Sequence, residues 1–298
     1  MPLQSSGPIS FSQIRTEYGG PQVVLSLSAY KRGGVNVPVN IYTGSISSGS
    51  APMSFSHYYN TRKRVPIALA INSNTYNYDI WGVAGLWAGS YAAGFSDFTV
   101  TIGNGVLVGS TSTTTYALTI SPQFNAGDTV TIINNGVIIG MGGQGHLGKF
   151  AGGGTAGAGD AGGVALRLQF PTTIQNNGVI AGGGGGGGGA GGFTQNAGIS
   201  GWGGGGGGGA GFNIGLAEGG PYQGSNGSTT SGGGPGYGQI YGVPGGAGGG
   251  RGEAGAAGSY SFGHTPSYGG AGGRAGYYIV GSNYATWSVV GSRLGLFA

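Results

Sequence analysis

The chain has 298 residues, of which 77 are glycine and only 6% are charged, and it contains no cysteine. Ordinary soluble domains carry roughly 25% charged residues, and without cysteine there is neither a disulfide framework nor a thiolate metal site. The net charge of +4 is small and its cations are dispersed, which argues against the broad basic face of a nucleic-acid binder.

The first residues lack a basic segment followed by an apolar one, so we expect no signal peptide. The chain also lacks a run of about 18 apolar residues, so we expect no membrane-spanning helix. Transport is then expected to occur by another route, such as assembly into a particle that lysis releases.

Residues 1–64 contain an internal repeat, in which 6–14 matches 50–58. Each copy has a proline followed by a serine that can cap a short helix, and Gln13 follows Ser10 at the capping-box spacing. Such a segment is either a helical cap on a β domain or a docking module for another protein. We favour docking, because each copy pairs a basic end with an aromatic face. The candidate docking residues are Phe11, Arg15, Phe55, Tyr58, Arg62, Lys63 and Arg64.

Residues 65–140 carry β patterns. Apolar or alternating runs predict strands at 65–71, 116–120 and 128–133, and a hairpin that joins 98–102 to 106–108. Short strands at this spacing are typical of a sandwich or a sheet stack. The aspartates of this region lie near turns, where their role is structural.

A second repeat spans 131–140 and 173–181, and each copy reads strand, Asn-Asn-Gly corner, strand, glycines. Repeated copies of such a unit predict stacked rungs, as in a solenoid or a β-prism-like shaft. The C-terminal residues 277–280 and 285–290 are expected to form a further hairpin.

The glycine runs at 182–189 and 203–209 dominate the C-terminal half. A polyglycine tract is usually a flexible linker. Here, however, strand-like segments flank it, large residues interrupt it, and few charges accompany it. The ordered alternative is a bundle of polyglycine or polyproline II-type helices, which have three residues per turn and bond to their neighbours.

These patterns predict a mostly β chain with a glycine-rich polyglycine/polyproline II-type helix bundle and a small helical N-terminal module. The expected domains are 1–64, 65–140 and 141–298. Function on such a scaffold should lie in the loops that interrupt the glycine, at 193–202, 212–230, 237–243 and 260–268. These loops are rich in Tyr, Ser, Asn and Gly, like adaptable recognition surfaces. An alternative is that some of the aromatics pack on the sides of the bundle. The candidate residues are Phe193, Trp202, Phe212, Tyr222, Tyr237, Tyr241, Tyr260, Phe262, His264 and Tyr268.

Signals for catalysis are weak. The seven carboxylates form no pair that the sequence places on one face, and no nucleophile elbow follows a strand. Gly148-Lys149 is followed by Phe150, where a phosphate-binding loop needs Ser or Thr. We therefore expect no enzyme activity, no metal and no cofactor.

The combined pattern resembles glycine-rich bacteriophage tail proteins, especially tail-fibre tip adhesins with a polyglycine II domain. The resemblance rests on Asn-Asn-Gly-Val-Ile-Ala before Gly182, on glycine segments that aromatic residues separate, and on the C-terminal Ile-Val-Gly-Ser…Thr-Trp…Gly motif at 279–291. It covers about residues 130–298. The motif at 6–12 also resembles the start of phage structural proteins. In such adhesins the glycine core is implied to hold loops at a distal tip. The long β region before the glycine departs from that pattern.

The resemblance implies a virion tail protein that binds a host cell-surface receptor, either an outer-membrane protein or a glycan, and that mounts on other tail proteins. The sequence leaves both a monomer and a homotrimer open. A purely structural tail or capsid component is the alternative. A secreted ice-binding or matrix protein is a third reading, but it would need an export signal.

Overall fold

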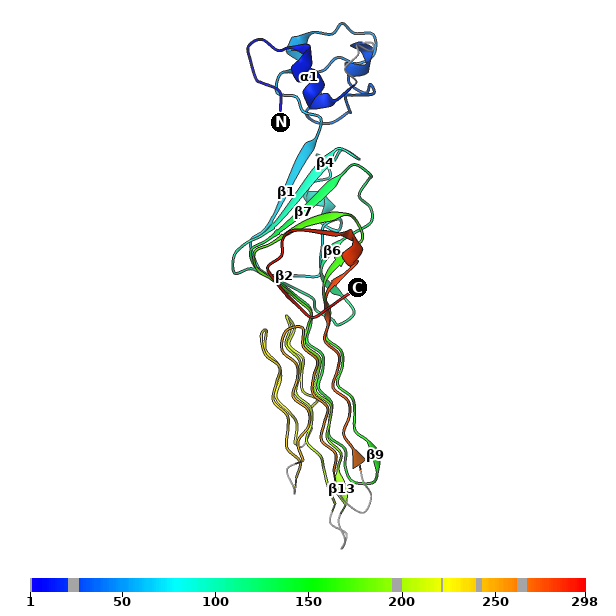
Figure 1. Cartoon of the computed structure of the whole chain (residues 1–298), viewed down its shortest axis with the longest axis vertical. Helices are drawn as coiled ribbons and strands as arrows, with labels where there is room; N and C mark the ends of the chain where they lie inside the picture. Colours follow the sequence, from blue (N-terminus) through cyan, green and yellow to red (C-terminus); the bar gives the residue numbers. More distant parts are fainter. Residues whose placement is uncertain (1, 21–26, 195–199, 221, 240–242, 262–266) are drawn as a thin grey trace. The chain divides into compact units, whose positions relative to one another are not determined.

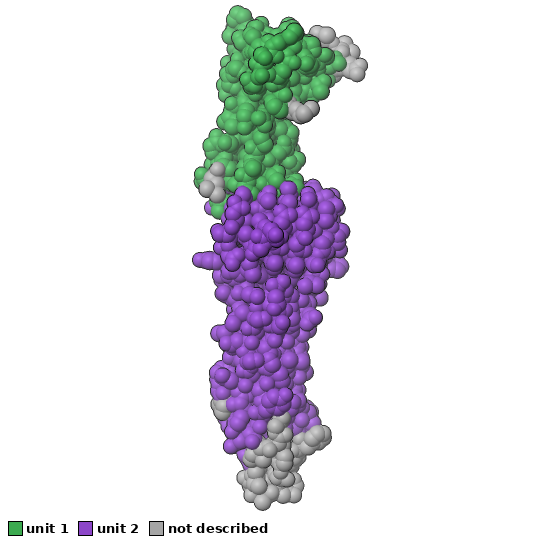
Figure 2. Space-filling model, turned by 90° about the vertical axis from the view of Figure 1, so that its left-hand side faces the viewer, with its two compact units in different colours: residues 1–69, 83–99, 123–131 green, residues 70–82, 100–122, 132–298 purple. Residues whose placement is uncertain are grey.

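The computed structural model describes residues 2–20, 27–194, 200–220, 222–239, 243–261 and 267–298. Contacts divide the chain into two compact units, coloured separately in Figure 2. Unit 1 comprises residues 1–69, 83–99 and 123–131, and unit 2 comprises residues 70–82, 100–122 and 132–298. The domain boundaries suggested by the sequence remain predictions.

Unit 1 contains helix α1 (Phe11–Tyr18) and two short 3-10 helices, η1 (Leu27–Tyr30) and η2 (Phe55–Tyr58). The capping box predicted at Ser10 and Gln13 is confirmed, with both reciprocal hydrogen bonds present. The second copy of the repeat, at 50–58, forms only the single 3-10 turn η2. There the side chain of Ser54 accepts a hydrogen bond from the backbone N–H of Ser56.

Three five-stranded sheets follow (Figure 1). In two of these sheets, which are given second and third below, every strand pair is parallel. In the remaining sheet β11 (Thr172–Asn176) pairs in parallel with β17 (Ala285–Val289). The first sheet has the order β1 (Val65–Ile71), β4 (Ser96–Ile102), β7 (Thr129–Asn134), β11 (Thr172–Asn176) and β17 (Ala285–Val289). The second has β2 (Thr75–Tyr76), β5 (Leu107–Gly109), β8 (Val137–Ile139), β12 (Val179–Ala181) and β18 (Ser292–Leu294). The third has β3 (Tyr78–Asp79), β6 (Tyr116–Ile120), β10 (Val164–Leu168), β16 (Tyr277–Val280) and β19 (Leu296–Phe297).

The chain visits the three sheets in turn, so each circuit is one rung of a parallel β-solenoid. Buried aliphatic side chains stack from rung to rung. In the second sheet Val108, Ile138 and Ile180 align in register and are fully buried. The aliphatic column ends at Arg293 in the last rung, whose guanidinium lies 4.8 Å from the centre of the Trp287 ring. The predicted rungs are therefore confirmed as a solenoid rather than a sandwich.

Two predicted hairpins are wrong. β4 and β5 belong to different sheets, and so do β16 and β17. In both cases the turn is a corner that sends the chain into the next sheet. β5 and β16 then pair in parallel with strands of the neighbouring rungs in their own sheets, and β17 pairs in parallel with β11.

The glycine-rich segments are insertions at one corner of this solenoid. The connection between the second and third sheets consists of Asn77 alone in the first rung and of residues 110–115 in the second rung. At the same corner, the connections of the third and fourth rungs comprise residues 140–163 and 182–276. The insertions run side by side away from the sheets (Figure 1). The long β region that departed from the expected pattern is thus the base from which the glycine segments extend.

Backbone hydrogen bonds join the glycine segments with a period of three. Segment 182–191 donates from Gly184, Gly187 and Ala190 to Ala210, Gly207 and Gly204 of one neighbour, at 2.7–2.8 Å. Its intervening donors reach two other neighbours, at 157–163 and at 253–259. Gly186 shows why these positions are glycine, because a Cβ there would lie 1.8 Å from the carbonyl oxygen of Gln144. Side-chain-free backbones can therefore approach from every direction.

The remaining short strands lie where glycine segments reverse. β9 (Gly154–Thr155) pairs in parallel with β15 (Ser267–Tyr268). β13 (Phe193–Thr194) pairs antiparallel with β14 (Ser200–Gly201). β9 and β13 are labelled at the end of the glycine segments that lies away from the sheets in Figure 1.

Candidate functional site

The glycine segments have two ends with different surroundings. At the solenoid end the chain reverses at 212–214, 228–231 and 250–253. The N–H of Phe212 donates to Gly140, and that of Gly252 donates to Gly182, next to strands β8 and β12. The opposite end, marked by β9 and β13 in Figure 1, is called the outer end here.

Aromatic side chains gather in pairs at the outer end. The rings of Phe150 and Trp202 lie 5.4 Å apart, and their backbones form an antiparallel bridge. The rings of Tyr260 and Tyr268 lie 5.3 Å apart, and Tyr268 continues the short β9–β15 pairing. Two aromatic pairs, one of them between residues far apart in the sequence, thus lie at the outer end and are partly exposed.

Two further tyrosines are exposed beside these pairs. Tyr237 is 63% exposed and its backbone bridges Pro244, while Tyr222 is 37% exposed. Tyr222 has a φ of 65°, an uncommon conformation for a residue other than glycine, which marks a tight reversal. Phe193 is buried instead, and its ring fills the space above Gly201. It therefore supports the β13–β14 hairpin from within.

Phe212 lies apart from these residues. Its ring packs directly on Gly109, where a Cβ would come within 1.9 Å of it, and 6.3 Å from the ring of Tyr76. This position is at the solenoid end. The remaining candidates, Tyr241, Phe262 and His264, lie outside the described residues.

Phe150 is an outer-end aromatic that the sequence reasoning missed, although it is 44% exposed. The signal was present, since Phe150 interrupts glycine-rich sequence between 142 and 163 in the same way as Trp202 interrupts the later runs. Lys149 beside it extends its ammonium group to the space above Gly154, a residue of β9. The first glycine insertion thus contributes to the outer end together with the second.

One polar cluster ties three glycine segments together along their length. The imidazole of His146 lies 3.3 Å from Asp160 through Nε2 and 3.3 Å from Glu218 through Nδ1. Glu218 also accepts a hydrogen bond of 2.9 Å from the backbone of Leu147. These contacts cross-link the three glycine segments through His146, Asp160 and Glu218.

The candidate docking residues of the N-terminal module have mixed surroundings. Tyr58 is fully buried, and burial raises its pKa to about 12. Phe11 packs edge-on against Tyr30, with ring centres 4.9 Å apart. Phe55 is 47% exposed, and Arg15 is half-buried.

The three successive cations are engaged within unit 1. The guanidinium of Arg62 lies 4.1 Å from the centre of the Tyr42 ring, and Lys63 donates to the carbonyl of Tyr18 at 2.9 Å. Arg64 donates to Asp97 at 2.7 Å. Burial alone would raise the pKa of Asp97, but hydrogen bonds from Arg64 and Thr129 and the charge of Arg64 hold it below its usual value.

An exposed apolar surface in the same module was not predicted. Val35, Val39 and Ile41 are 93%, 62% and 53% exposed, and Leu27 is also exposed. Exposed apolar side chains mark a contact surface where they form a contiguous patch.

Within the described residues, no group of His, Cys, Asp or Glu has the geometry to hold a metal ion. Likewise, no helix in that part of the chain combines the length and the apolar character needed to cross a bilayer.

Comparison with known proteins gives two matches. A family model described as "Phage tail fibre adhesin Gp38" matches residues 66–297. The solved structure described as the gp37-gp38 adhesin tip complex of the bacteriophage S16 long tail fiber aligns with a TM-score of 0.55 at 22% identity. That alignment covers 99% of this chain and 100% of the other. No curated protein matches the sequence.

Proposed function

Because this chain belongs to the phage tail fibre adhesin Gp38 family, we propose that it attaches the virion to a host cell surface through the outer end of its glycine segments. Its receptor would be an outer-membrane protein or a glycan. Binding takes place without catalysis or a cofactor, in keeping with carboxylates that are scattered through the sequence.

The convergence of exposed aromatic residues at the outer end carries this proposal. Phe150, Trp202, Tyr237 and Tyr268 come from four different segments and keep edges open to solvent. Tyrosine and tryptophan supply large, rigid contact areas at low entropic cost and are enriched among the residues that dominate binding energies. Phe193 supports this surface from below instead of contacting the receptor. Phe212, at the solenoid end, serves the attachment of the glycine segments.

We further propose that the glycine segments are polyglycine II helices. The hydrogen-bond period of three matches a helix with three residues per turn and no internal hydrogen bonds. Each segment is then fixed by the neighbouring segments to which it bonds, so the outer end is held rigid. A rigid platform loses little conformational entropy when it binds, which favours affinity.

The N-terminal module is proposed to mount the adhesin on another tail-fibre protein. The exposed Val35, Val39, Ile41 and Phe55 support this role, because apolar surface of this kind gains from burial against a partner. The similar solved structure is a complex of gp38 with gp37. Tyr58, Lys63 and Arg64 then hold the module itself in shape, since each is engaged inside unit 1.

Competition with intact virions tests the attachment role. Purified protein added to host bacteria should reduce phage adsorption, and a variant with Trp202→Ala, Tyr237→Ser and Tyr268→Ser should lose this effect while it keeps its unfolding midpoint. Tyr284→Ser, at an exposed tyrosine of the solenoid, is the matched control and should compete like the wild type. Failure of the wild-type protein to bind cells while it still assembles into tail fibres would favour a purely structural role.

A further inference from the structure

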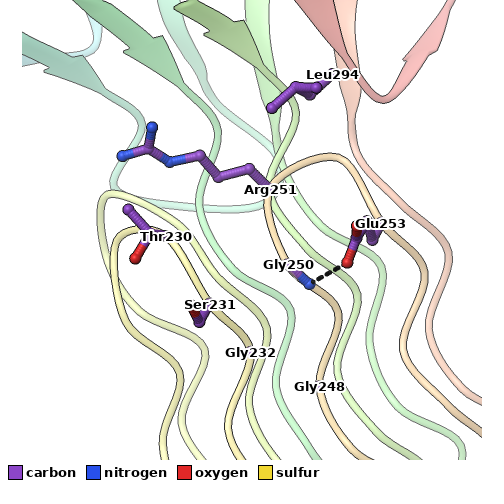
Figure 3. Close-up of a pocket in the computed structure, with 8 residues that line it drawn as sticks. All are labelled: Thr230, Ser231, Gly232, Gly248, Gly250, Arg251, Glu253 and Leu294. Carbon is purple, nitrogen blue, oxygen red and sulfur yellow. Dashed lines mark hydrogen bonds between the residues drawn. The ribbon is translucent and has the colours of Figure 1, made fainter.

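A small cleft at the solenoid end of the glycine segments lies apart from the outer-end aromatics. It has a volume of about 540 Å³, and Thr230, Ser231, Arg251, Glu253 and Leu294 supply its side chains. Figure 3 shows it between the turn at 228–231, the turn at 250–253 and the last rung of the solenoid. The volume lies within the range of about 300–1,000 Å³ found for small-ligand sites.

Both turns that frame the cleft are fixed by hydrogen bonds. Oγ of Ser228 accepts from the backbone N–H groups of Thr230 and Ser231, at 3.2 and 2.8 Å. In the other turn Glu253 accepts from the N–H of Gly250 through its carboxylate and donates its own N–H to the Gly250 carbonyl, each at 3.1 Å. These hydrogen bonds therefore fix the backbone that carries the hydroxyls of Thr230 and Ser231 and the side chain of Arg251.

Arg251 supplies an unpaired positive charge. Its Nε donates to the carbonyl of Thr229 at 2.7 Å, which orients the guanidinium plane. Among the described residues, no carboxylate lies within ion-pair distance of it, and neither terminal nitrogen has a hydrogen-bond partner. Burial lowers the pKa of Arg251, so its charge is partly desolvated without compensation. In Figure 3 the side chain extends over Thr230, whereas Glu253 lies on the other side of the 250–253 turn.

We propose that this cleft binds an oxyanion carried by a saccharide, either a carboxylate or a phosphate. The two terminal nitrogens of a planar guanidinium form a fork that matches two oxygens of such a group. The hydroxyls of Thr230 and Ser231 can meet sugar hydroxyls, and the exposed side chain of Leu294 offers an apolar wall. This inference is independent of the proposed outer-end contact.

Titration of ¹⁵N-labelled full-length protein tests the proposal. The probes are sodium phosphate, D-glucuronate and neutral D-glucose, and the signals are Arg251 Nε–H and the amides of Thr230, Ser231 and Gly232. We expect saturable shifts with phosphate and with glucuronate, at a dissociation constant on the order of millimolar, and none with glucose. The tighter of the two anions identifies the group that the site prefers.

Arg251→Gln should weaken binding about tenfold or more, because it removes charge-assisted hydrogen bonds. Arg274→Gln removes the same charge from an exposed residue outside the cleft and should leave the affinity unchanged. The unfolding midpoint of each variant reports whether it remains folded. If Arg251→Gln loosens the 228–231 turn, Arg251→Lys supplies a second variant that keeps the charge but lacks the fork and should bind less tightly than the wild type. Absence of saturable shifts with either anion, or equal binding by Arg251→Gln or by glucose, would overturn the proposal.

Discussion

The side-chain amide of Asn134 donates a hydrogen bond of 2.8 Å to the side-chain oxygen of Asn176, and both residues are fully buried. The two asparagines occupy the same corner of consecutive rungs, at the ends of β7 and β11. Nδ2 of Asn176 in turn donates to the carbonyls of Val290 and Ser292, at the corresponding corner of the last rung. This ladder of amides satisfies buried backbone groups where the solenoid turns its corner.

Asn176→Asp should destabilise the solenoid strongly. A carboxylate at this position would lose both donors and place a negative charge beside two carbonyl oxygens in a site without solvent. We expect a loss of roughly 3–5 kcal/mol, the usual cost of an uncompensated buried charge. The urea midpoint, followed by the fluorescence of Trp287 on neighbouring β17, measures the loss.

The adjacent Asn177→Asp is the control for this prediction. Asn177 is exposed, and within the described part of the chain its side chain bonds only to Asn135 in the rung before it. Its replacement should change stability by less than about 1 kcal/mol. Equal losses in the two variants would show that the buried ladder has no special role.

Much of the solenoid could be predicted from local sequence. The Asn-Asn-Gly repeat and the apolar runs identified β7, β8, β11 and β12 as parts of stacked rungs. The expected hairpins failed at Gly103 and Gly281, because a turn motif does not reveal whether the chain returns in the same sheet or enters the next. That choice depends on the apolar column of the neighbouring rung, which only the assembled fold supplies.

The glycine segments should tolerate a methyl group only where the surface is open. Gly186→Ala would bring Cβ to 1.8 Å from the carbonyl oxygen of Gln144, whereas at Gly234, which is exposed, the nearest atom is the Ser225 hydroxyl at 3.5 Å. We expect Gly186→Ala to cost about 1–3 kcal/mol or more through overpacking. Gly234→Ala should be neutral or slightly stabilising, because alanine has less conformational freedom in the unfolded chain. Thermal unfolding of the pair decides between an ordered array and a tract that accepts alanine anywhere.

The candidate site was only partly readable in the sequence. Aromatics that interrupt glycine were found, because large side chains cannot enter an array packed backbone to backbone. The end at which each aromatic lies depends on the number of residues in a segment before the chain reverses. Phe212 follows a segment that has returned to the solenoid, so it lies beside Gly109 instead of at the outer end. The Arg251 cleft gave no local signal, since its residues come from two turns and the last rung.

The ion pair of Arg64 with Asp97 should make unit 1 sensitive to acid. The folded-state pKa of Asp97 lies below that of the unfolded chain, about 3.9. Its stabilising contribution is therefore present above about pH 4 and is lost as the pH falls through the folded-state pKa. Asp97 is 39% exposed, so the effect should stay below about 1 kcal/mol. The wild type should exceed Asp97→Asn in unfolding midpoint by more at pH 7 than at pH 3. An unchanged difference would mean that the pair does not contribute through its charge.

The contact between Phe150 and Trp202 makes a specific prediction about host binding. Since the two rings lie 5.4 Å apart at the outer end, each should orient the other for the receptor. We expect Phe150→Ala and Trp202→Ala each to weaken cell binding by about 1–4 kcal/mol, as for central aromatic residues of interfaces. The double variant should lose less than the sum, with a coupling of about 0.5–1.5 kcal/mol for an aromatic pair. Binding isotherms of labelled protein on host cells measure all four forms. Additive losses would mean that the rings act separately, and unchanged affinity in both single variants would remove the first glycine insertion from the receptor surface.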